Sequence, residues 1–226
     1  NKFVIQFTGT INTPHTIKYT TNFDYNQRTD KALNYLQNSV TLTWKDEAGV
    51  DQSKSAKSNF TPDDYTQSNG FKNGSYNAVS KEITWDVGVN YNLHTVENAS
   101  VEDFILVNQK LIKDSIEVYE MSLTGGSNGT EVKELIPGVD YAISWVEKDG
   151  NPGFLVKFNN TITKPYMVTY KTSLRDAHFV NAKYSNTATV YEGTEKVTDL
   201  KATVSIPHGG SYTTKSGKQN GKIIDW

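Results

Sequence analysis

The stretch FLVKFNNTITKPYMVTYKT, residues 154–172, contains two segments in which apolar and polar residues alternate. FLVKFNN (154–160) and YMVTYKT (166–172) both predict strands with one buried face, because successive side chains of a strand point to opposite sides of a sheet. The residues between them are polar and end in Pro165, which favours a connection.

An earlier stretch, FVIQFTGTINTPHTIKYTT (3–21), aligns with this one without a gap. Each later residue number exceeds its counterpart by 151, and identical pairs occur at Phe3/Phe154, Phe7/Phe158, Thr10/Thr161, Ile11/Ile162, Pro14/Pro165, Tyr19/Tyr170 and Thr21/Thr172. Two more matches follow in the same order, namely QNSVTLT (37–43) with SNTATVY (185–191), and Lys72 with Lys215. Matches in one order indicate an internal repeat whose loops differ in length.

Most of the remaining chain has the same two-residue alternation, with many Val, Ile, Thr and aromatic residues. Only VEDFILVNQKLIKD (101–114) has a spacing that also fits a helix, and it fits a two-residue period almost as well. Turn-forming pairs such as Pro-Gly (137–138) and Asp-Gly (149–150) separate the segments. The sequence therefore predicts an all-β protein with an antiparallel β-sandwich. Its strands are expected at 3–9, 15–21, 39–44, 83–91, 115–121, 141–147, 154–160, 166–172, 187–193 and 201–206.

The repeat divides the chain into three predicted parts. Residues 69–209 are expected to form one complete β-sandwich domain. Residues 1–68 correspond to the C-terminal strands of a preceding repeat, and residues 210–226 to the first strand of a following one. This arrangement predicts tandem repeats, with adjacent repeats of the same protein as partners.

Composition argues against several classes of function. The net charge of −2 and the pI near 6.1 lack the basic character of a nucleic-acid-binding protein. No run of 18 apolar residues is present, so no membrane insertion is expected. The chain has no Cys, and its four His residues lack metal-ligand spacing, so neither a metal site nor a cofactor is expected. No G-x-S-x-G, H-E-x-x-H or S-x-x-K motif stands out together with its partner residues, so the sequence does not indicate a conventional enzyme.

Several short motifs together resemble the collagen-binding domain family of Gram-positive cell-wall-anchored surface adhesins. They are KNG (72–74), EITWDVGVNYN (82–92), ASVEDFI (99–105), the 154–172 stretch and YSNTATV (184–190). The resemblance implies a β-sandwich of variant immunoglobulin-like topology, with Trp85 pointing inward. It also implies an extracellular, cell-wall-anchored location. Members of the family often carry a spontaneous Lys–Asn isopeptide bond, formed with the help of a buried Asp.

Carried over to this chain, the family pattern assigns the isopeptide partners to Lys72 on the first strand and Asn186 on the last core strand. It assigns the catalytic acid to Asp103, at the end of the strand that follows the Trp strand. Asn181 remains an alternative to Asn186, because it also lies in an alternating segment. By the same mapping, Asn38 and Lys215 belong to the triads of the neighbouring repeats.

The residue pattern supports this assignment in part. Asp103 shares one face of an extended strand with Val101 and Ile105, and Asn186 shares a face with Ala188. A buried polar group without a partner costs about 1–3 kcal/mol, so these polar groups are expected to meet in the core. Burial would lower the pKa of the Lys72 amine and raise that of Asp103. A neutral amine could then attack Asn186, while protonated Asp103 donates a hydrogen bond to its carbonyl oxygen.

Two functions follow as hypotheses. The first is a structural and adhesive repeat module of a bacterial surface adhesin, whose only catalysis is the formation of its own isopeptide bond. The alternative is a module that binds collagen, another host matrix protein or a glycan. Because a fold does not fix a function, the resemblance alone does not choose between them.

Overall fold

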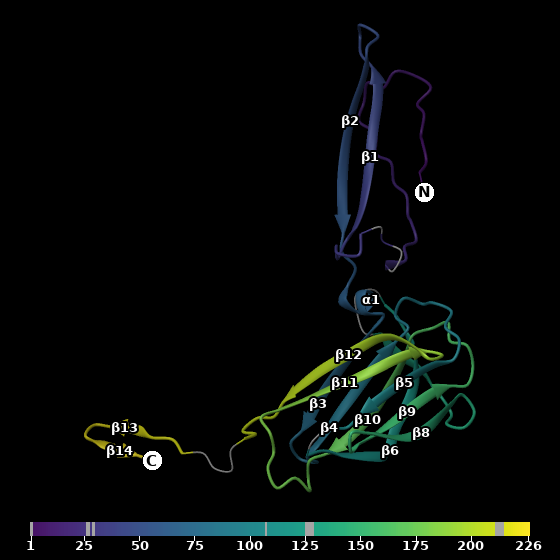
Figure 1. The fold of residues 1–226 in the computed structure, drawn as a ribbon. Coiled ribbons are helices and arrows are strands. Elements are labelled where there is room, and N and C mark those ends of the chain that lie inside the picture. Colours follow the sequence, from purple (N-terminus) through teal and green to yellow (C-terminus); the bar gives the residue numbers. More distant parts are fainter. Residues whose placement is uncertain (1, 26–27, 29, 107, 125–128, 211–214) are drawn as a thin grey trace.

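The computed structural model describes the chain apart from residues 1, 26–27, 29, 107, 125–128 and 211–214. Two five-stranded sheets face each other and form a sandwich (Figure 1). The first sheet has the order β3 (Gly70–Asn77), β4 (Glu82–Val89), β10 (Tyr166–Ser173), β6 (Lys110–Ser122) and β7 (Thr130–Glu134). The second has the order β12 (Glu195–Ser205), β11 (Lys183–Glu192), β5 (Ala99–Phe104), β9 (Asn151–Phe158) and β8 (Tyr141–Lys148). Neighbouring strands are antiparallel, which confirms the predicted all-β, immunoglobulin-like sandwich.

The two segments of the 154–172 stretch form β9 and β10, as predicted. They belong to different sheets, so the connection between them crosses from one layer of the sandwich to the other. The ambiguous segment 101–114 contributes to two strands, β5 and β6, and forms no helix. Its two-residue period was therefore the informative one.

The core lies between the two sheets and follows from the alternation of each strand. On β4, Ile83, Trp85 and Val87 are buried and face the second sheet, while the residues between them are half-buried. The largest fully buried side chains include Trp85, Tyr141, Tyr170 and Phe154. Burying one large apolar side chain stabilises a fold by about 1.5–3 kcal/mol, so this layer supplies most of the driving force for folding.

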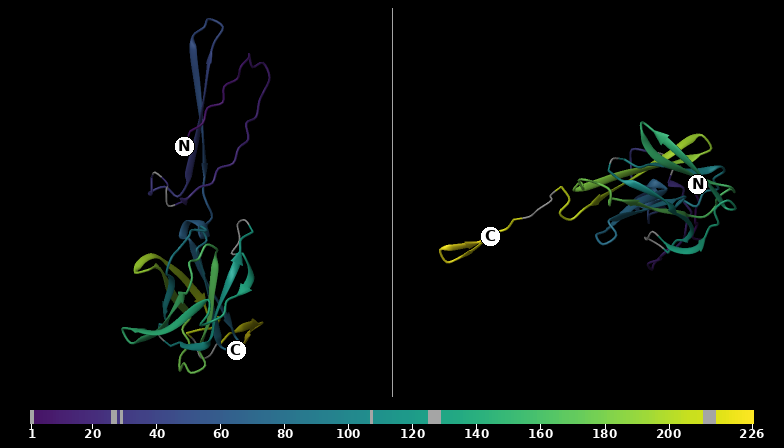
Figure 2. Two further views of the ribbon diagram at one scale, coloured as in Figure 1. Left: turned by 90° about the vertical axis from the view of Figure 1, so that its right-hand side faces the viewer. Right: turned by 90° about the horizontal axis from the view of Figure 1, so that it is seen from below.

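Two hairpins lie outside the sandwich (Figures 1 and 2). The first is formed by β1 (Leu36–Lys45) and β2 (Asp51–Phe60), and the second by β13 (Lys218–Asn220) and β14 (Ile223–Asp225). The short helix α1 (Asp64–Ser68) joins the first hairpin to β3. Asp63 caps its N-terminus, because the Asp63 side chain accepts a hydrogen bond from the Thr66 backbone, and Asn69 in the left-handed region caps its C-terminus. No helix in the described part of the chain is long and apolar enough to cross a membrane.

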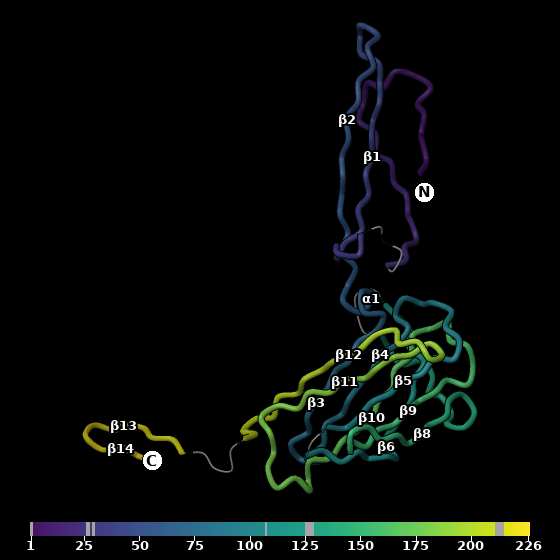
Figure 3. Tube along the Cα trace, viewed as in Figure 1, coloured from purple at the N-terminus to yellow at the C-terminus, as the bar shows by residue number. Residues whose placement is uncertain are grey.

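The strands predicted at 3–9 and 15–21 are absent, and this prediction was wrong for the structure. The trace there is extended but without strand pairing (Figure 3). The alternation reports only that one face of the segment is apolar, whereas a strand also needs a neighbour for its backbone hydrogen bonds. In the sandwich the matching residues have such neighbours, because β9 lies between β5 and β8 in one sheet and β10 lies between β4 and β6 in the other.

Candidate functional site

Lys72 lies on β3, in the first sheet, and points into the core. Its directly opposed residue on β4 is Val87, and Gly74 is opposed to Trp85. A Cβ atom on Gly74 would come within 2.8 Å of the Trp85 ring and 2.4 Å of Val204. The Lys-x-Gly spacing therefore has a physical reason, because the bare glycine leaves room for the indole ring beside the lysine. The Lys72 ammonium nitrogen lies 5.4 Å from the centre of that ring.

Asp103 and Asn186 lie on neighbouring strands of the second sheet, β5 and β11. Asp103 is directly opposed to Ala188, and Asn186 is two residues away from Ala188 on the same face. Both side chains consequently point towards the first sheet. Lys72 and Asp103 have fully buried side chains, and Asn186 is 2% exposed. The structure thus brings together the three residues that the family resemblance assigned.

The contacts in this cluster are short. Lys72 Nζ donates to Asp103 Oδ2 at 2.6 Å. Tyr170 lies between the three residues, and its hydroxyl donates to the same Asp103 oxygen at 2.6 Å. The Tyr170 oxygen also accepts from Lys72 Nζ at 3.1 Å and from Asn186 Nδ2 at 2.8 Å.

Tyr170 is the member of this cluster that sequence reasoning missed. It is on β10, it is fully buried, and its hydroxyl contacts all the members of the predicted triad. Two signals could have identified it. Tyr170 is on the same face as Val168 and Thr172, so its hydroxyl had to be satisfied inside the core, and it is one of the identical positions of the repeat.

Burial shifts the pKa of each ionisable group in the cluster towards its neutral form. It lowers the pKa of the Lys72 amine below its ordinary value of 10.5, although the neighbouring Asp103 opposes the shift. It raises the pKa of Asp103 above 3.8, against the opposing effects of Lys72, of the hydrogen bond from Tyr170 and of the nearby Asn186 amide. Burial, followed by the charge of Asp103, raises the pKa of Tyr170 well above 10. Both shifts make the transfer of a proton from Lys72 to Asp103 easier than it would be in water.

Two oxygens of the cluster have no hydrogen-bond partner, Asp103 Oδ1 and Asn186 Oδ1. The sequence suggested that Asp103 would donate to the Asn186 carbonyl oxygen. In the structure Asp103 accepts hydrogen bonds through Oδ2. Neither the Oδ1 atom of Asp103 nor that of Asn186 has a hydrogen-bond partner. With a proton on its Oδ1 atom, Asp103 would become a hydrogen-bond donor, and the Asn186 carbonyl oxygen is a buried acceptor that lacks a donor.

Asn186 is on β11, and β12 follows it, so the expectation that it lies on the last core strand was wrong. The strand predicted at 201–206 forms part of β12, and Leu200 and Val204 of β12 belong to the core. The alternative residue, Asn181, lies in the loop before β11 and is half-buried. Its backbone N–H donates to the Tyr184 hydroxyl.

The two residues mapped to neighbouring repeats lie outside this cluster. Asn38 is on β1, and its side chain donates to the Tyr19 hydroxyl. Lys215 precedes β13, and its ammonium nitrogen lies 4.5 Å from the centre of the Trp226 ring. Neither is part of the sandwich core.

The arrangement can do one kind of chemistry without added groups. A lysine amine, a carboxamide and a carboxylic acid are held together where water is excluded, and a phenol touches all three. An amine freed of its proton is a nucleophile, and the acid can polarise the amide carbonyl. No group of His, Asp and Glu residues suited to a metal ion occurs in the part of the chain that the structure describes.

Comparison with known proteins gives one match to a family of sequences. The family model described as the collagen binding domain matches residues 67–200, more than half of the chain. No curated protein sequence matches the chain.

Solved structures give further similarities. The collagen-binding subdomain of the Enterococcus faecalis surface protein ACE is 20% identical, covering 61% of this chain and 97% of that one, with a TM-score of 0.46. The collagen-binding domain of a Staphylococcus aureus adhesin is 15% identical, with the same coverages and a TM-score of 0.42. The major pilin SpaA of Corynebacterium diphtheriae is 13% identical, covering 57% of this chain and 32% of the pilin, with a TM-score of 0.40.

Proposed function

The chain belongs to the collagen-binding domain family, and on that premise we propose that it is a structural and adhesive module of a bacterial surface adhesin, stabilised by a self-formed Lys72–Asn186 isopeptide bond. The observation that carries the proposal is the buried contact of Lys72 with Asp103 and Tyr170, beside the Asn186 carboxamide. A lysine is almost never fully buried unless it is paired, and the partner of Lys72 is an equally buried acid.

The reaction starts with a proton transfer across the 2.6 Å contact, from Lys72 Nζ to Asp103. The neutral amine then attacks Cγ of Asn186, while the Asp103 acid polarises the Asn186 carbonyl oxygen. A new Nζ–Cγ bond forms and the Cγ–Nδ2 bond breaks. The Lys72 nitrogen gives up one proton, the Asn186 nitrogen takes up one proton and leaves as ammonia, and the atoms balance without water, an oxidant or a cofactor.

Tyr170 has a specific part in this reaction. Its oxygen lies 3.1 Å from the attacking nitrogen and 2.8 Å from the leaving nitrogen, and its proton lies on the line to Asp103. The phenol can therefore accept a proton from Lys72 Nζ and donate one to Asn186 Nδ2. Its raised pKa keeps the hydroxyl protonated before the reaction.

The product would join the two sheets covalently, because Lys72 is on β3 and Asn186 is on β11. The bond would close a loop on the order of 100 residues, for which the chain-entropy account gives about 4–5 kcal/mol of stabilisation. In a chain without Cys this bond would take the place of a disulfide. A stalk that projects from a cell wall and bears load is the setting in which such a bond is useful, and we place the module there, next to similar repeats.

The test is the intact mass of the purified chain under denaturing conditions. The expected mass is lower than the sequence mass by one ammonia, and fragment spectra should join a β3 peptide to a β11 peptide. Lys72→Ala, Asp103→Ala and Asn186→Ala should each restore the full mass. Asn181→Ala is the matched control and should still lose ammonia. A full mass in the folded wild-type chain would refute the bond.

A second function is favoured by the family match itself, namely binding of collagen, another host matrix protein or a glycan. It is tested by the binding of the whole chain to immobilised collagen and to polysaccharides. Saturable binding that survives in Asn186→Ala would assign a ligand site separate from the cross-link. Absence of binding would leave the structural role alone.

A further inference from the structure

A cavity of about 180 Å³, here called the end cavity, lies between the two sheets at the end of the sandwich next to α1 (Figure 1). Its apolar lining comes mainly from strand ends and includes Val89, Val101, Phe158, Ile162 and Val190. The first four of these are 1–4% exposed, so the cavity reaches into the core. A cavity of about 150 Å³ holds a benzene molecule, so the end cavity has room for one six-membered ring.

The end cavity has a structural cause in the hairpin of β11 and β12. The pairing of these strands shifts its register between Val190 and Tyr191. A bulge of this kind bends a strand and redirects its side chains. Beyond the shift, the Tyr191 hydroxyl donates to Glu102 of β5, and Val197 of β12 lines the cavity while remaining 46% exposed. The tip of the hairpin therefore does not close over the core, and the cavity opens to solvent beside Val197.

The loop between β4 and β5 forms another wall of the end cavity, and buried hydrogen bonds fix its conformation. The Asn90 side chain is buried, accepts from the His94 N–H at 3.0 Å, and donates to the carbonyl oxygens of His94 and Lys164 at 2.8 and 3.1 Å. Val96 and Ile162 exchange two backbone hydrogen bonds. A ligand would therefore find this wall already formed, and its binding would not have to order the loop.

Half of the residues that line the end cavity are polar. Thr95 and Glu192 are exposed where the cavity meets solvent, and Asn69 is half-buried with its carbonyl oxygen bound to the N–H of Asn92 at 2.8 Å. A purely apolar ligand would displace water from these groups and return no hydrogen bonds, which costs free energy. The lining therefore fits a small ring that has an apolar face and several hydroxyl or amide groups.

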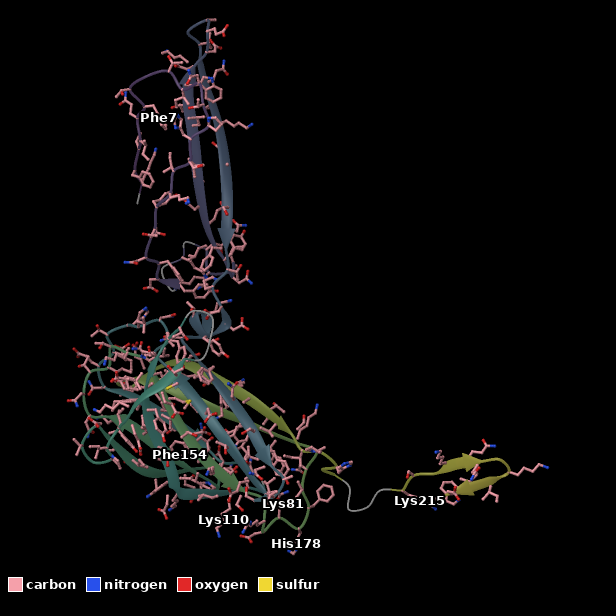
Figure 4. All side chains as sticks on the ribbon, turned by 180° about the vertical axis from the view of Figure 1, so that it is seen from behind. Phe7, Lys81, Lys110, Phe154, His178 and Lys215 are labelled. Atoms are coloured by element: carbon pink, nitrogen blue, oxygen red, sulfur yellow. The ribbon has the colours of Figure 1, made fainter. Side chains whose placement is uncertain are left out.

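The charge around the end cavity disfavours an anionic ligand. Among its lining residues, all in the described part of the chain, His94 and Glu192 carry the only acidic or basic groups. His94 lies 3.6 Å from Asp24, whose carboxylate would offset a positive charge on the imidazole ring. The basic residues Lys81 and Lys110 lie at the opposite end of the sandwich (Figure 4). Because a site lined by one sign of charge repels ligands of that sign, a neutral ligand fits better than a carboxylate, sulfate or phosphate.

We propose that the end cavity binds one terminal neutral sugar unit of a glycan, a hexose or an N-acetylhexosamine. The proposal rests on the second function above, which includes glycans, and names its site and ligand class. The C–H face of the sugar packs against Val101 and Phe158, and its hydroxyls bind Thr95 and Glu192. Hydrogen bonds to a carboxylate are the stronger ones, so Glu192 sets the orientation of the ring. Pockets for drug-sized ligands measure about 300–1,000 Å³, so a single unit enters and the rest of the glycan stays outside.

The test is a titration of the full chain with small ligands, followed by NMR of the methyl groups of Val101 and Val190. The ligands are the methyl glycosides of glucose, galactose, N-acetylglucosamine and N-acetylgalactosamine. N-acetylneuraminate serves as the anionic comparison, and N-acetyl-leucine amide as the comparison for an apolar side chain of a peptide. At least one neutral glycoside should shift both methyl signals saturably in the millimolar range, and neither comparison ligand should bind as tightly.

Variants at the opening of the end cavity locate the sugar. Glu192→Gln and Thr95→Val should each weaken binding about 2–10-fold, the effect of one lost hydrogen bond. Val197→Trp should abolish binding, because the indole ring fills the opening. Glu195→Gln on the same hairpin and Val139→Trp, at a position that is 64% exposed outside the cavity, are the matched controls and should bind like the wild-type chain. The dispersed amide spectrum of each variant shows that it is folded.

The outcomes separate this proposal from the functions proposed above. Unshifted methyl signals with every neutral glycoside would refute it, as would binding that survives in Val197→Trp. Tighter binding of N-acetylneuraminate or of N-acetyl-leucine amide would refute the ligand class. Ammonia loss or collagen binding without sugar binding would overturn the end cavity as a glycan site and leave the cross-link or the collagen site standing. Sugar binding by a chain of full mass would do the reverse for the cross-link.

Discussion

The Nζ atom of Lys72 lies 2.6 Å from Oδ2 of Asp103, and both side chains are fully excluded from solvent. The two residues come from opposite sheets of the sandwich, so the contact spans the core. A buried pair of this kind costs more in desolvation than it returns unless further hydrogen bonds satisfy it, and one oxygen of Asp103 remains unpaired. The buried pair therefore contributes little to the stability of the fold, which favours a reactive role for it.

The first prediction concerns the noncovalent pair. In an Asn186→Ala background, where no cross-link can form, Asp103→Asn should lower the free energy of unfolding by about 3–5 kcal/mol, because it leaves Lys72 without a buried counter-charge. Adding Lys72→Met should recover part of this loss, since no buried charge then remains. Denaturant titration measures both. Glu102→Gln, next along β5, is the control and should cost less than about 1 kcal/mol. Additive costs of the two substitutions would contradict the coupling.

The second prediction concerns Tyr170. Tyr170→Phe keeps the ring and removes the hydroxyl that contacts the attacking and leaving nitrogens. The rate of ammonia loss after folding should fall about 10²–10⁴-fold, the usual contribution of a positioned proton-transfer group. The mass of the chain is followed with time after dilution from denaturant, in which it has been kept unfolded since synthesis. Tyr141→Phe, which removes another buried hydroxyl, should react at the wild-type rate, and an unchanged rate in Tyr170→Phe would exclude the relay.

The third prediction is a bell-shaped dependence of this rate on pH. At low pH both groups are protonated and Lys72 is an ammonium, which cannot attack. At high pH neither carries a proton, and Asp103 cannot polarise the Asn186 carbonyl. The limbs belong to the pair and not to either residue alone, and because burial raises the pKa of Asp103 above 3.8 and lowers the pKa of Lys72 below 10.5, both limbs should lie between these values. A rate that rises steadily through pH 10.5 would show that Asp103 takes no part as an acid.

The fourth prediction concerns Gly74. A methyl group there would meet the Trp85 ring at 2.8 Å and Val204 at 2.4 Å. Gly74→Ala should therefore lower the free energy of unfolding by about 1–3 kcal/mol, the range for an overpacked core. Gly9→Ala, in open space, should change it by less than about 0.5 kcal/mol. Equal effects of the two substitutions in denaturant titration would show that the Lys-x-Gly spacing has another cause.

The fifth prediction concerns force applied between residues 69 and 209. With the cross-link, the chain between Lys72 and Asn186 cannot extend, and only the segment after Asn186, which includes the edge strand β12, should pull out. In Asn186→Ala the additional segment should add roughly 400 Å of contour length. Single-molecule force extension measures this difference. Equal contour lengths in the two chains would contradict a load-bearing bond.

The sequence alone determined the class of the fold and most of its strands. Two-residue alternation located β4, β9 and β10, because each has one face in the core and one away from it. The order and spacing of short motifs led to Lys72, Asp103 and Asn186 through a family resemblance. The alternation at 3–9 and 15–21 gave the wrong result for the same reason that it succeeded elsewhere, since it reports an apolar face and not whether a neighbouring strand is present.

Only the tertiary structure showed which residues meet across the core, because the alternation of apolar and polar residues carries no information on this. Tyr170 is 67 residues from Asp103 along the chain and only 16 from Asn186, yet its hydroxyl contacts both because β10 faces the second sheet across the core. The shifts of pKa likewise depend on burial between two layers, which no local sequence specifies. Alternation fixes which side of a strand is apolar, because it is a property of one strand. Which residues meet across the core depends on how strands distant in sequence are paired and stacked, and that is set only when the two sheets close on each other.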